Sequence, residues 1–126
     1  MPFIQIKSLP FEEPKPISDI LCRINQDFSL RLDVPLEQIH STWEFFQPGH
    51  FAKGDLAPSC QPDSFHSLLV TLLTADFNHP EAGEMMLQVL AESLVKHARV
   101  PLRKIFIQHH QACSGMVFDD GKIARW

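Results

Sequence analysis

The chain contains one sequence pattern twice, and the second copy lies 66 residues after the first. The hexapeptide VPLEQI at 34–39 returns as VPLRKI at 100–105. The same displacement superimposes prolines, glycines and apolar residues elsewhere, namely Pro14 on Pro80, Ile20 on Met86, Leu21 on Leu87, Ile24 on Leu90, Phe28 on Leu94 and Gly49 on Gly115. So many matches at one displacement argue against chance. We therefore predict one domain, 1–126, built from two similar units at 2–60 and 68–126.

Each unit shows the same order of hydrophobic periods. Short β-rich runs at 3–7 and 68–73 each precede a segment with the i, i+3, i+4, i+7 spacing of a helix that buries one face. The apolar residues with this spacing are Ile17, Ile20, Leu21, Ile24 and Phe28 in the first unit and Ala82, Met85, Met86, Val89, Leu90 and Leu94 in the second. Prolines bracket both predicted helices, Pro16 and Pro80 in the first turn and Pro35 and Pro101 just beyond the end.

A second strand is predicted after each helix, at 38–46 and 104–110, so each unit is β-α-β with parallel strands. Two such units predict an α+β fold, in which a four-stranded mixed sheet carries two helices on one face. The sequence DDG at 119–121 predicts a turn in a short terminal hairpin. Residues 47–63 are rich in Gly, Pro and Ser and are predicted to form the loop that joins the units.

The predicted sheet has one face without helices. The run at 68–73 (LLVTLL) is nevertheless apolar on both of its alternating sides. An exposed apolar face of this kind is typical of an interaction surface. Self-association is the simplest way to cover it.

Composition and charge exclude several classes of function. The net charge is -4 and the 11 Lys and Arg residues are scattered, which disfavours nucleic-acid binding. No apolar run approaches the roughly 20 residues of a membrane-spanning helix. Cys22, Cys60 and Cys113 lie far apart and no signal segment is recognisable, so we expect free thiols and a cytoplasmic protein.

His109, His110 and Cys113 invite a metal-site interpretation. Adjacent residues of a strand point to opposite faces, however, and no fourth ligand lies at a recognisable spacing. We therefore predict no metal site. The cysteines also lack a Cys-x-x-Cys pair or an evident base, which gives little support to a cysteine nucleophile.

Four short segments resemble the 4-oxalocrotonate tautomerase family and its fused relatives, such as the macrophage migration inhibitory factor group. Pro2 follows the initiator Met, QI at 5–6 lies in the first strand, LDVPL at 32–36 ends the helix, and GHF at 49–51 follows the second strand. The resemblance implies removal of the initiator Met, which frees the Pro2 nitrogen to act as general base or acid toward a carbonyl compound. It also implies a homotrimer, because three two-unit chains supply the six units that single-unit members assemble.

The resemblance also implies where the other site residues lie. Phe51 matches the family's pocket aromatic and could form an apolar wall that disfavours the ammonium form of Pro2. The family's two carboxylate-binding arginines fall at Glu12 and His40, which disfavours a dicarboxylate substrate. His40 is a catalytic candidate that could polarise a carbonyl oxygen or bind one carboxylate, although a hydrogen-bonded strand residue is the simpler interpretation.

Positive charge near a substrate could come from Lys7 and Lys53, with Arg103 and Lys104 as further candidates, unless these side chains are merely solvated. The second unit has Leu68 in place of Pro2, so one chain can supply only one such amine. The sequence thus favours a proline-dependent tautomerase-like enzyme without a cofactor, acting on a small keto-enol or α,β-unsaturated carbonyl acid. Hydration and dehalogenation stay open, and the alternative is a non-catalytic oligomeric binding or structural protein of the same fold.

Overall fold

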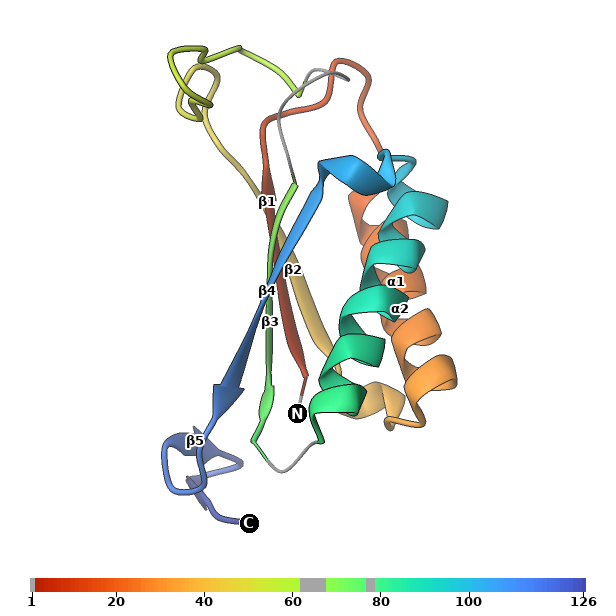
Figure 1. Ribbon diagram of the computed structural model, residues 1–126, viewed down its shortest axis with the longest axis vertical. Coiled ribbons are helices and arrows are strands. Elements are labelled where there is room, and N and C mark those ends of the chain that lie inside the picture. The colour runs from red at the N-terminus through yellow and green to blue at the C-terminus, as the bar shows by residue number, and fades with distance from the viewer. Residues whose placement is uncertain (1, 62–67, 77–78) are drawn as a thin grey trace.

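The computed structural model, which describes residues 2–61, 68–76 and 79–126, has a four-stranded sheet with both helices packed on one face (Figure 1). The strands lie in the order β2-β1-β3-β4. β1 pairs parallel to β2, β3 pairs parallel to β4, and β1 and β3 pair antiparallel at the centre. The predicted α+β fold is therefore confirmed. The bounds are β1 Phe3–Ser8, α1 Ile17–Leu32, β2 His40–Phe45, β3 Leu68–Ala75, α2 Pro80–Ala98, β4 Ile105–Ala112, β5 Val117–Asp119 and β6 Lys122–Ala124.

The two units repeat each other in backbone detail. Both helices end on a residue in the left-handed conformation, Asp33 with φ 53° and Arg99 with φ 56°, and these residues are 66 positions apart. A 3-10 turn follows each helix, at Leu36–Gln38 and Leu102–Lys104. The second strands therefore start one or two residues later than predicted, because the first residues after each proline close this turn. Pro80 opens α2 as predicted, whereas Pro16 lies one residue before α1.

The core lies between the sheet and the helices. Every second side chain of β1 and β3 points into it, and the helices contribute their predicted apolar stripes. Met85 is the exception: it is predicted in the buried stripe of the second helix, but it is 57% exposed because it lies on the flank of the face that Met86, Val89 and Leu90 bury. The side chains with at most 2% exposure include Ile4, Ile6, Ile20, Ile24, Phe28, Leu68, Val70, Leu72, Leu90 and Leu94. This packing fixes the register of the strands, since a slip of one residue would turn the apolar side chains to the other face.

The opposite side of the sheet, here called the uncovered face, carries a grid of side chains from all four strands. The strand register defines three rows across it, which are His40–Phe3–Leu73–His110, Thr42–Gln5–Thr71–Gln108 and Glu44–Lys7–Leu69–Phe106. Phe106 is 55% exposed, and Leu69 and Leu73 are half-buried. The apolar face expected from the run at 68–73 is thus present, with its leucines at both ends and a polar row between them.

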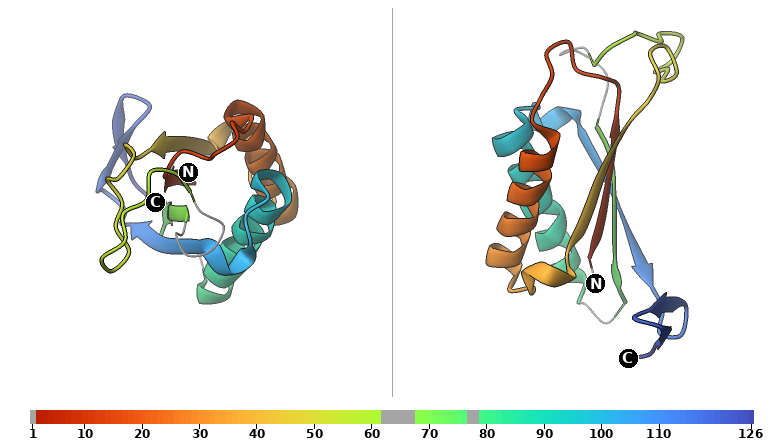
Figure 2. Two further views of the ribbon diagram at one scale, coloured as in Figure 1. Left: turned by 90° about the horizontal axis from the view of Figure 1, so that it is seen from above. Right: turned by 180° about the vertical axis from the view of Figure 1, so that it is seen from behind.

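Two arms extend from opposite ends of the sheet on its uncovered side. One is the loop 46–61, which contains a single β-bridge between Lys53 and Leu56, and the other is the β5–β6 hairpin (Figure 2). The predicted hairpin turn is confirmed, with positive φ at Asp120 and Gly121. The predicted joining loop is confirmed as far as residue 61, since 62 and 63 lie outside the described residues. Among the described residues, no helix is both long and apolar enough to span a membrane.

Candidate functional site

Pro2 and His40 lie together at one end of the sheet, where β1 and β2 begin. Pro2 is buried, and its carbonyl oxygen accepts a hydrogen bond from the backbone N–H of His40 at 3.1 Å. The His40 ring stacks on Phe3 of β1, with ring centroids 5.9 Å apart and an interplanar angle of 14°. The imidazole is therefore held flat against an aromatic ring on the uncovered face, beside the start of β1.

Phe51, Lys53 and Lys7 gather at the other end of the sheet. A cavity of about 240 Å³ is lined by Phe51, Ala52, Lys53, Leu69 and Phe106. A second cavity of about 250 Å³ adjoins it through Leu69 and Phe106, and Lys7 and Gln5 are among its walls. The Phe51 ring packs on Phe46 with ring centroids 5.3 Å apart. These three predicted binding residues thus share one stretch of the uncovered face.

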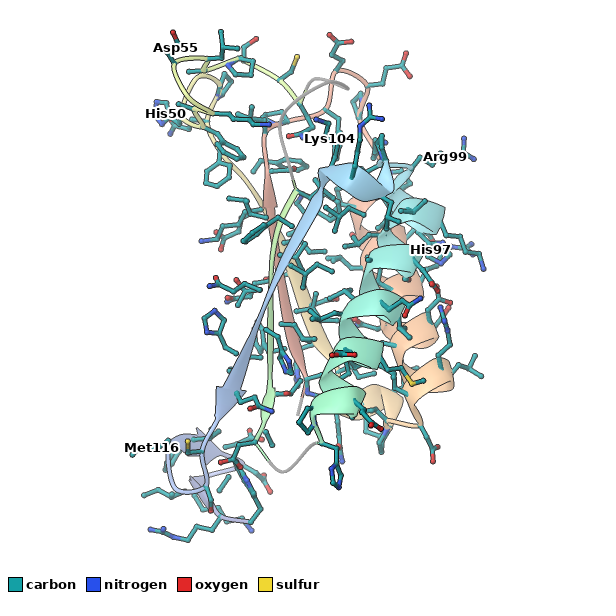
Figure 3. All side chains as sticks on the ribbon, viewed as in Figure 1. His50, Asp55, His97, Arg99, Lys104 and Met116 are labelled. Carbon is teal, nitrogen blue, oxygen red and sulfur yellow. The ribbon has the colours of Figure 1, made fainter. Side chains whose placement is uncertain are left out.

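Several cations lie at this end, although Glu44 is the cross-strand neighbour of Lys7. Desolvation lowers the pKa of Lys104 below its ordinary value, and the nearby charges of Lys53 and Arg103 lower it further. Figure 3 shows Lys104 at this end of the sheet, where β4 begins, with His50 and Asp55 in the loop beyond. Neighbouring cations that lower one another's pKa in this way attract an anionic group such as a carboxylate.

One protomer does not bring Pro2 and Phe51 into a single pocket. β1 runs from the Pro2 end to the Lys7 end, and five residues of extended chain span about 17 Å. Glu12 also lies away from Pro2, in the β1–α1 connection that follows the far end of β1, where the Cys60 thiol donates to its carboxylate at 3.7 Å. A pocket that contains both Pro2 and Phe51 therefore requires a neighbouring chain.

The structure also reveals a cavity of about 360 Å³ between α2 and β4 that sequence reasoning missed. His109 and Gly83 are among its walls, and Thr74 Oγ1 lies 2.7 Å from His109 Nε2. Partial burial lowers the pKa of His109, and the charge of His110 lowers it further. His109 faces α2 whereas His110 lies on the uncovered face. The two histidines therefore point to opposite faces of the sheet, as the sequence argument against a shared metal site assumed. Among the described residues, no three His, Cys, Asp or Glu side chains are placed to hold a metal ion.

Comparison with known proteins establishes the fold. No protein-family model matches the sequence, and no curated protein sequence is significantly similar. A native fused 4-OT is 12% identical over 97% of this chain and 95% of that chain, with a TM-score of 0.78. The R7 fused 4-OT, an asymmetric trimer, is 11% identical over 97% of this chain and 95% of that chain, with a TM-score of 0.80. Macrophage migration inhibitory factor from Oncomelania hupensis is 14% identical over 98% and 82%, with a TM-score of 0.73. The chain therefore shares the fold of these fused 4-OT and macrophage migration inhibitory factor structures.

Proposed function

We propose that this chain is a proline-dependent tautomerase-like enzyme that acts on a small keto-enol or α,β-unsaturated carbonyl acid. The observation that carries the proposal is the position of Pro2, buried at the start of β1 in a fold shared with fused 4-OT structures. Removal of Met1 would turn the Pro2 nitrogen from an amide into a basic secondary amine. We assign Pro2 as general base and acid, and the reaction needs no cofactor.

The proposed chemistry is proton transfer at carbon. The amine takes a proton from the carbon next to a carbonyl and returns it elsewhere on the substrate. An ordinary α-amino group titrates near pH 8, and apolar surroundings disfavour its charged form, so a buried terminus suits a base that works near neutral pH. His40, stacked on Phe3 beside the start of β1, is assigned to polarise the carbonyl oxygen.

We propose that the complete site forms between chains of a homotrimer. Pro2 and His40 of one protomer would face Phe51, Lys53 and Lys7 of the next, with the lysines holding the substrate carboxylate. Two features support this arrangement, the separation of these groups within one protomer and the apolar residues of the uncovered face. Fused 4-OT structures of this fold include both an asymmetric and a symmetric trimer. The three cysteines are free thiols, in keeping with a cytoplasmic enzyme.

The decisive experiment compares processed protein with a form that retains Met1. Ketonisation of phenylpyruvate and of 2-hydroxydienoates is measured for both, and intact mass establishes which form is present. Activity in the processed form that disappears in the Met-extended form supports Pro2 as the base. Pro2→Ala keeps a primary amine, so its activity should fall without vanishing. Equal rates in the processed and Met-extended forms would transfer the role of base to His40.

The second candidate function is a non-catalytic oligomeric binding protein. The observation that favours it is the replacement of both expected arginines by Glu12 and His40. The binding-protein hypothesis predicts that the chain assembles normally but ketonises neither substrate, whether or not Met1 is present. Light scattering together with the ketonisation assay separates the two functions.

A further inference from the structure

The two units share a ring-to-hydroxyl hydrogen bond at equivalent positions. In the first unit, Trp43 Nε1 donates to Ser8 Oγ at 3.1 Å. In the second unit, His109 Nε2 and Thr74 Oγ1 are hydrogen-bonded at 2.7 Å. Trp43 and His109 are 66 positions apart, as are Ser8 and Thr74. The same strand positions thus support the same contact in both units.

The strand residues beside this contact are aromatic in the first unit, whereas those of the second unit are polar and line a cavity. Trp43 and Phe45 pack with Phe11 into an aromatic cluster, with ring centroids 5.9 to 6.3 Å apart. The residues 66 positions after Trp43 and Phe45 are His109 and Gln111. Both replacements exchange an aromatic side chain for a smaller polar one. They line the 360 Å³ cavity in the second unit, which lies within the roughly 300–1,000 Å³ of ordinary ligand pockets.

A glycine of the cavity wall lies directly against the His109 ring. Gly83 is a buried residue of α2 and occupies the position of Ile17 in the first unit. Glycine within a helix is destabilising relative to alanine, so its presence needs a spatial reason. A Cβ at Gly83 would lie 3.3 Å from both Cε1 and Nδ1 of His109. An alanine would therefore require the imidazole to shift by a few tenths of an ångström and would change the shape of the cavity wall.

The lining determines which ligand the cavity suits. Glu84 supplies a carboxylate, and Gln111, His109 and His79 supply groups for hydrogen bonds. Partial burial and the charge of His110 both lower the pKa of His109, which favours its neutral form. Leu87 and Pro80 form apolar walls. A ligand with a positive end and an apolar body matches this combination better than a carboxylate, which Glu84 would repel.

We propose that this cavity binds a small organic ammonium compound. The ammonium group lies against the Glu84 carboxylate and the Gln111 side-chain carbonyl, and the apolar body rests on Leu87 and Pro80. The site is additional to the proposed tautomerase site, because none of Pro2, His40 or Phe51 belongs to its lining. It does not depend on whether Met1 is removed.

The proposal is tested with three probes of similar shape and different charge, which are benzylamine, benzyl alcohol and benzoate. Each is titrated into the full chain, and NMR follows the amide of Gly83 and the ring of His109. We expect benzylamine to shift both signals in a saturable way and to bind about tenfold or more tightly than benzoate, since a nearby charge discriminates on this scale. Equal affinity for the three probes, or no response from Gly83 and His109 at millimolar benzylamine, would overturn the proposal.

Variants separate the cavity from a general charge effect. Glu84→Gln should weaken benzylamine binding about threefold to tenfold and remove the preference over benzyl alcohol. Glu81→Gln is the matched control, because it removes the same charge from the same helix outside the cavity lining and should leave affinity unchanged. Gly83→Ala shifts the His109 ring in the cavity wall and should weaken benzylamine binding in a chain that stays folded. If Gly83→Ala does not fold, Glu84→Gln still tests the proposal. The Met-extended chain should bind benzylamine like the processed chain, so loss of tautomerase activity leaves this result intact.

Discussion

The carboxylate of Asp27 joins the two helices, and replacing it with Asn should destabilise the fold in a pH-dependent way. Asp27 Oδ2 accepts hydrogen bonds from Ser93 Oγ at 2.7 Å and from His97 Nε2 at 2.8 Å. Ser93 is buried, and the side chains of His97 and Asp27 are only 11% and 27% exposed. Figure 3 shows His97 on the outer, helical side of the molecule, away from the uncovered face.

The expected magnitude follows from the two hydrogen bonds. A bond to a charged group contributes about 1.5–3 kcal/mol and a neutral one about 0.5–1.5 kcal/mol, so each loses about 1 kcal/mol when the charge is removed. Partial exposure of Asp27 reduces the sum, and we expect Asp27→Asn to lower the free energy of unfolding by roughly 1–2 kcal/mol. At this chain length that corresponds to a fall in Tm of roughly 4–8 °C.

The pH dependence has a definite sign. Partial burial by itself raises the pKa of Asp27, but the hydrogen bonds from Ser93 and His97 and the charges of His97 and Lys96 outweigh it, and the pKa is lowered. A carboxyl with a lowered folded-state pKa stabilises the fold above its unfolded pKa of about 3.9 and loses that contribution as pH falls. The gap in stability between the wild-type chain and Asp27→Asn should therefore be full at pH 6 and narrow by pH 3.

Urea unfolding at fixed protein concentration measures this gap at each pH. Asp19→Asn is the control, because Asp19 forms an exposed pair with Arg23 at 2.9 Å and should cost less than about 0.5 kcal/mol. A gap that stays constant from pH 6 to pH 3, or an Asp27→Asn variant as stable as the Asp19→Asn control at pH 6, would refute the reasoning.

Three further predictions concern the interface, a helix end and the core. Co-expression of the Met-extended chain with the Phe51→Ala chain should restore activity that neither chain shows alone. In randomly mixed assemblies about a quarter of the sites should combine a free Pro2 from one chain with an intact Phe51 from the next, and no recovery would exclude a pocket shared between chains. Lys15→Met should lower the free energy of unfolding by about 1 kcal/mol, because Lys15 Nζ donates to the Ala98 carbonyl at 2.6 Å at the end of α2; an unchanged Tm would contradict this. Phe28→Ala should cost about 3–5 kcal/mol in urea unfolding, since Phe28 is 1% exposed, and a cost below 1 kcal/mol would contradict the described core.

The fold was largely predictable because local and long-range signals agree. The stripe that includes Ile20, Ile24 and Phe28 gave one helix face, and these residues are buried. The 66-residue displacement then extended the same interpretation to the second unit. The turns at Gln38 and Lys104 were missed, because a 3-10 turn and the start of a strand share the same short apolar pattern there.

The candidate site was less predictable, because the sequence does not show which strand ends lie close together in space. Pro2 and His40 come together since their strands start side by side, and Phe51 falls at the other end since it follows β2. The cavity at Gly83 needed the structure for a different reason. A cavity is a property of packing, and the replacement of Trp43 by His109 at the equivalent strand position is the sequence difference that accompanies it.

The antiparallel pairing of β1 with β3 has a consequence for any closed assembly of this chain. Because the two units run in opposite directions, the start of β1 at Pro2 and the start of β3 at Leu68 lie at opposite ends of the sheet. In the proposed trimer, the three copies of Pro2 would therefore lie at one end of the assembly and the three copies of Leu68 at the other. An assembly of six identical units would have the same residues at both ends. Joining two different units in one chain allows each end of the assembly to have its own chemistry.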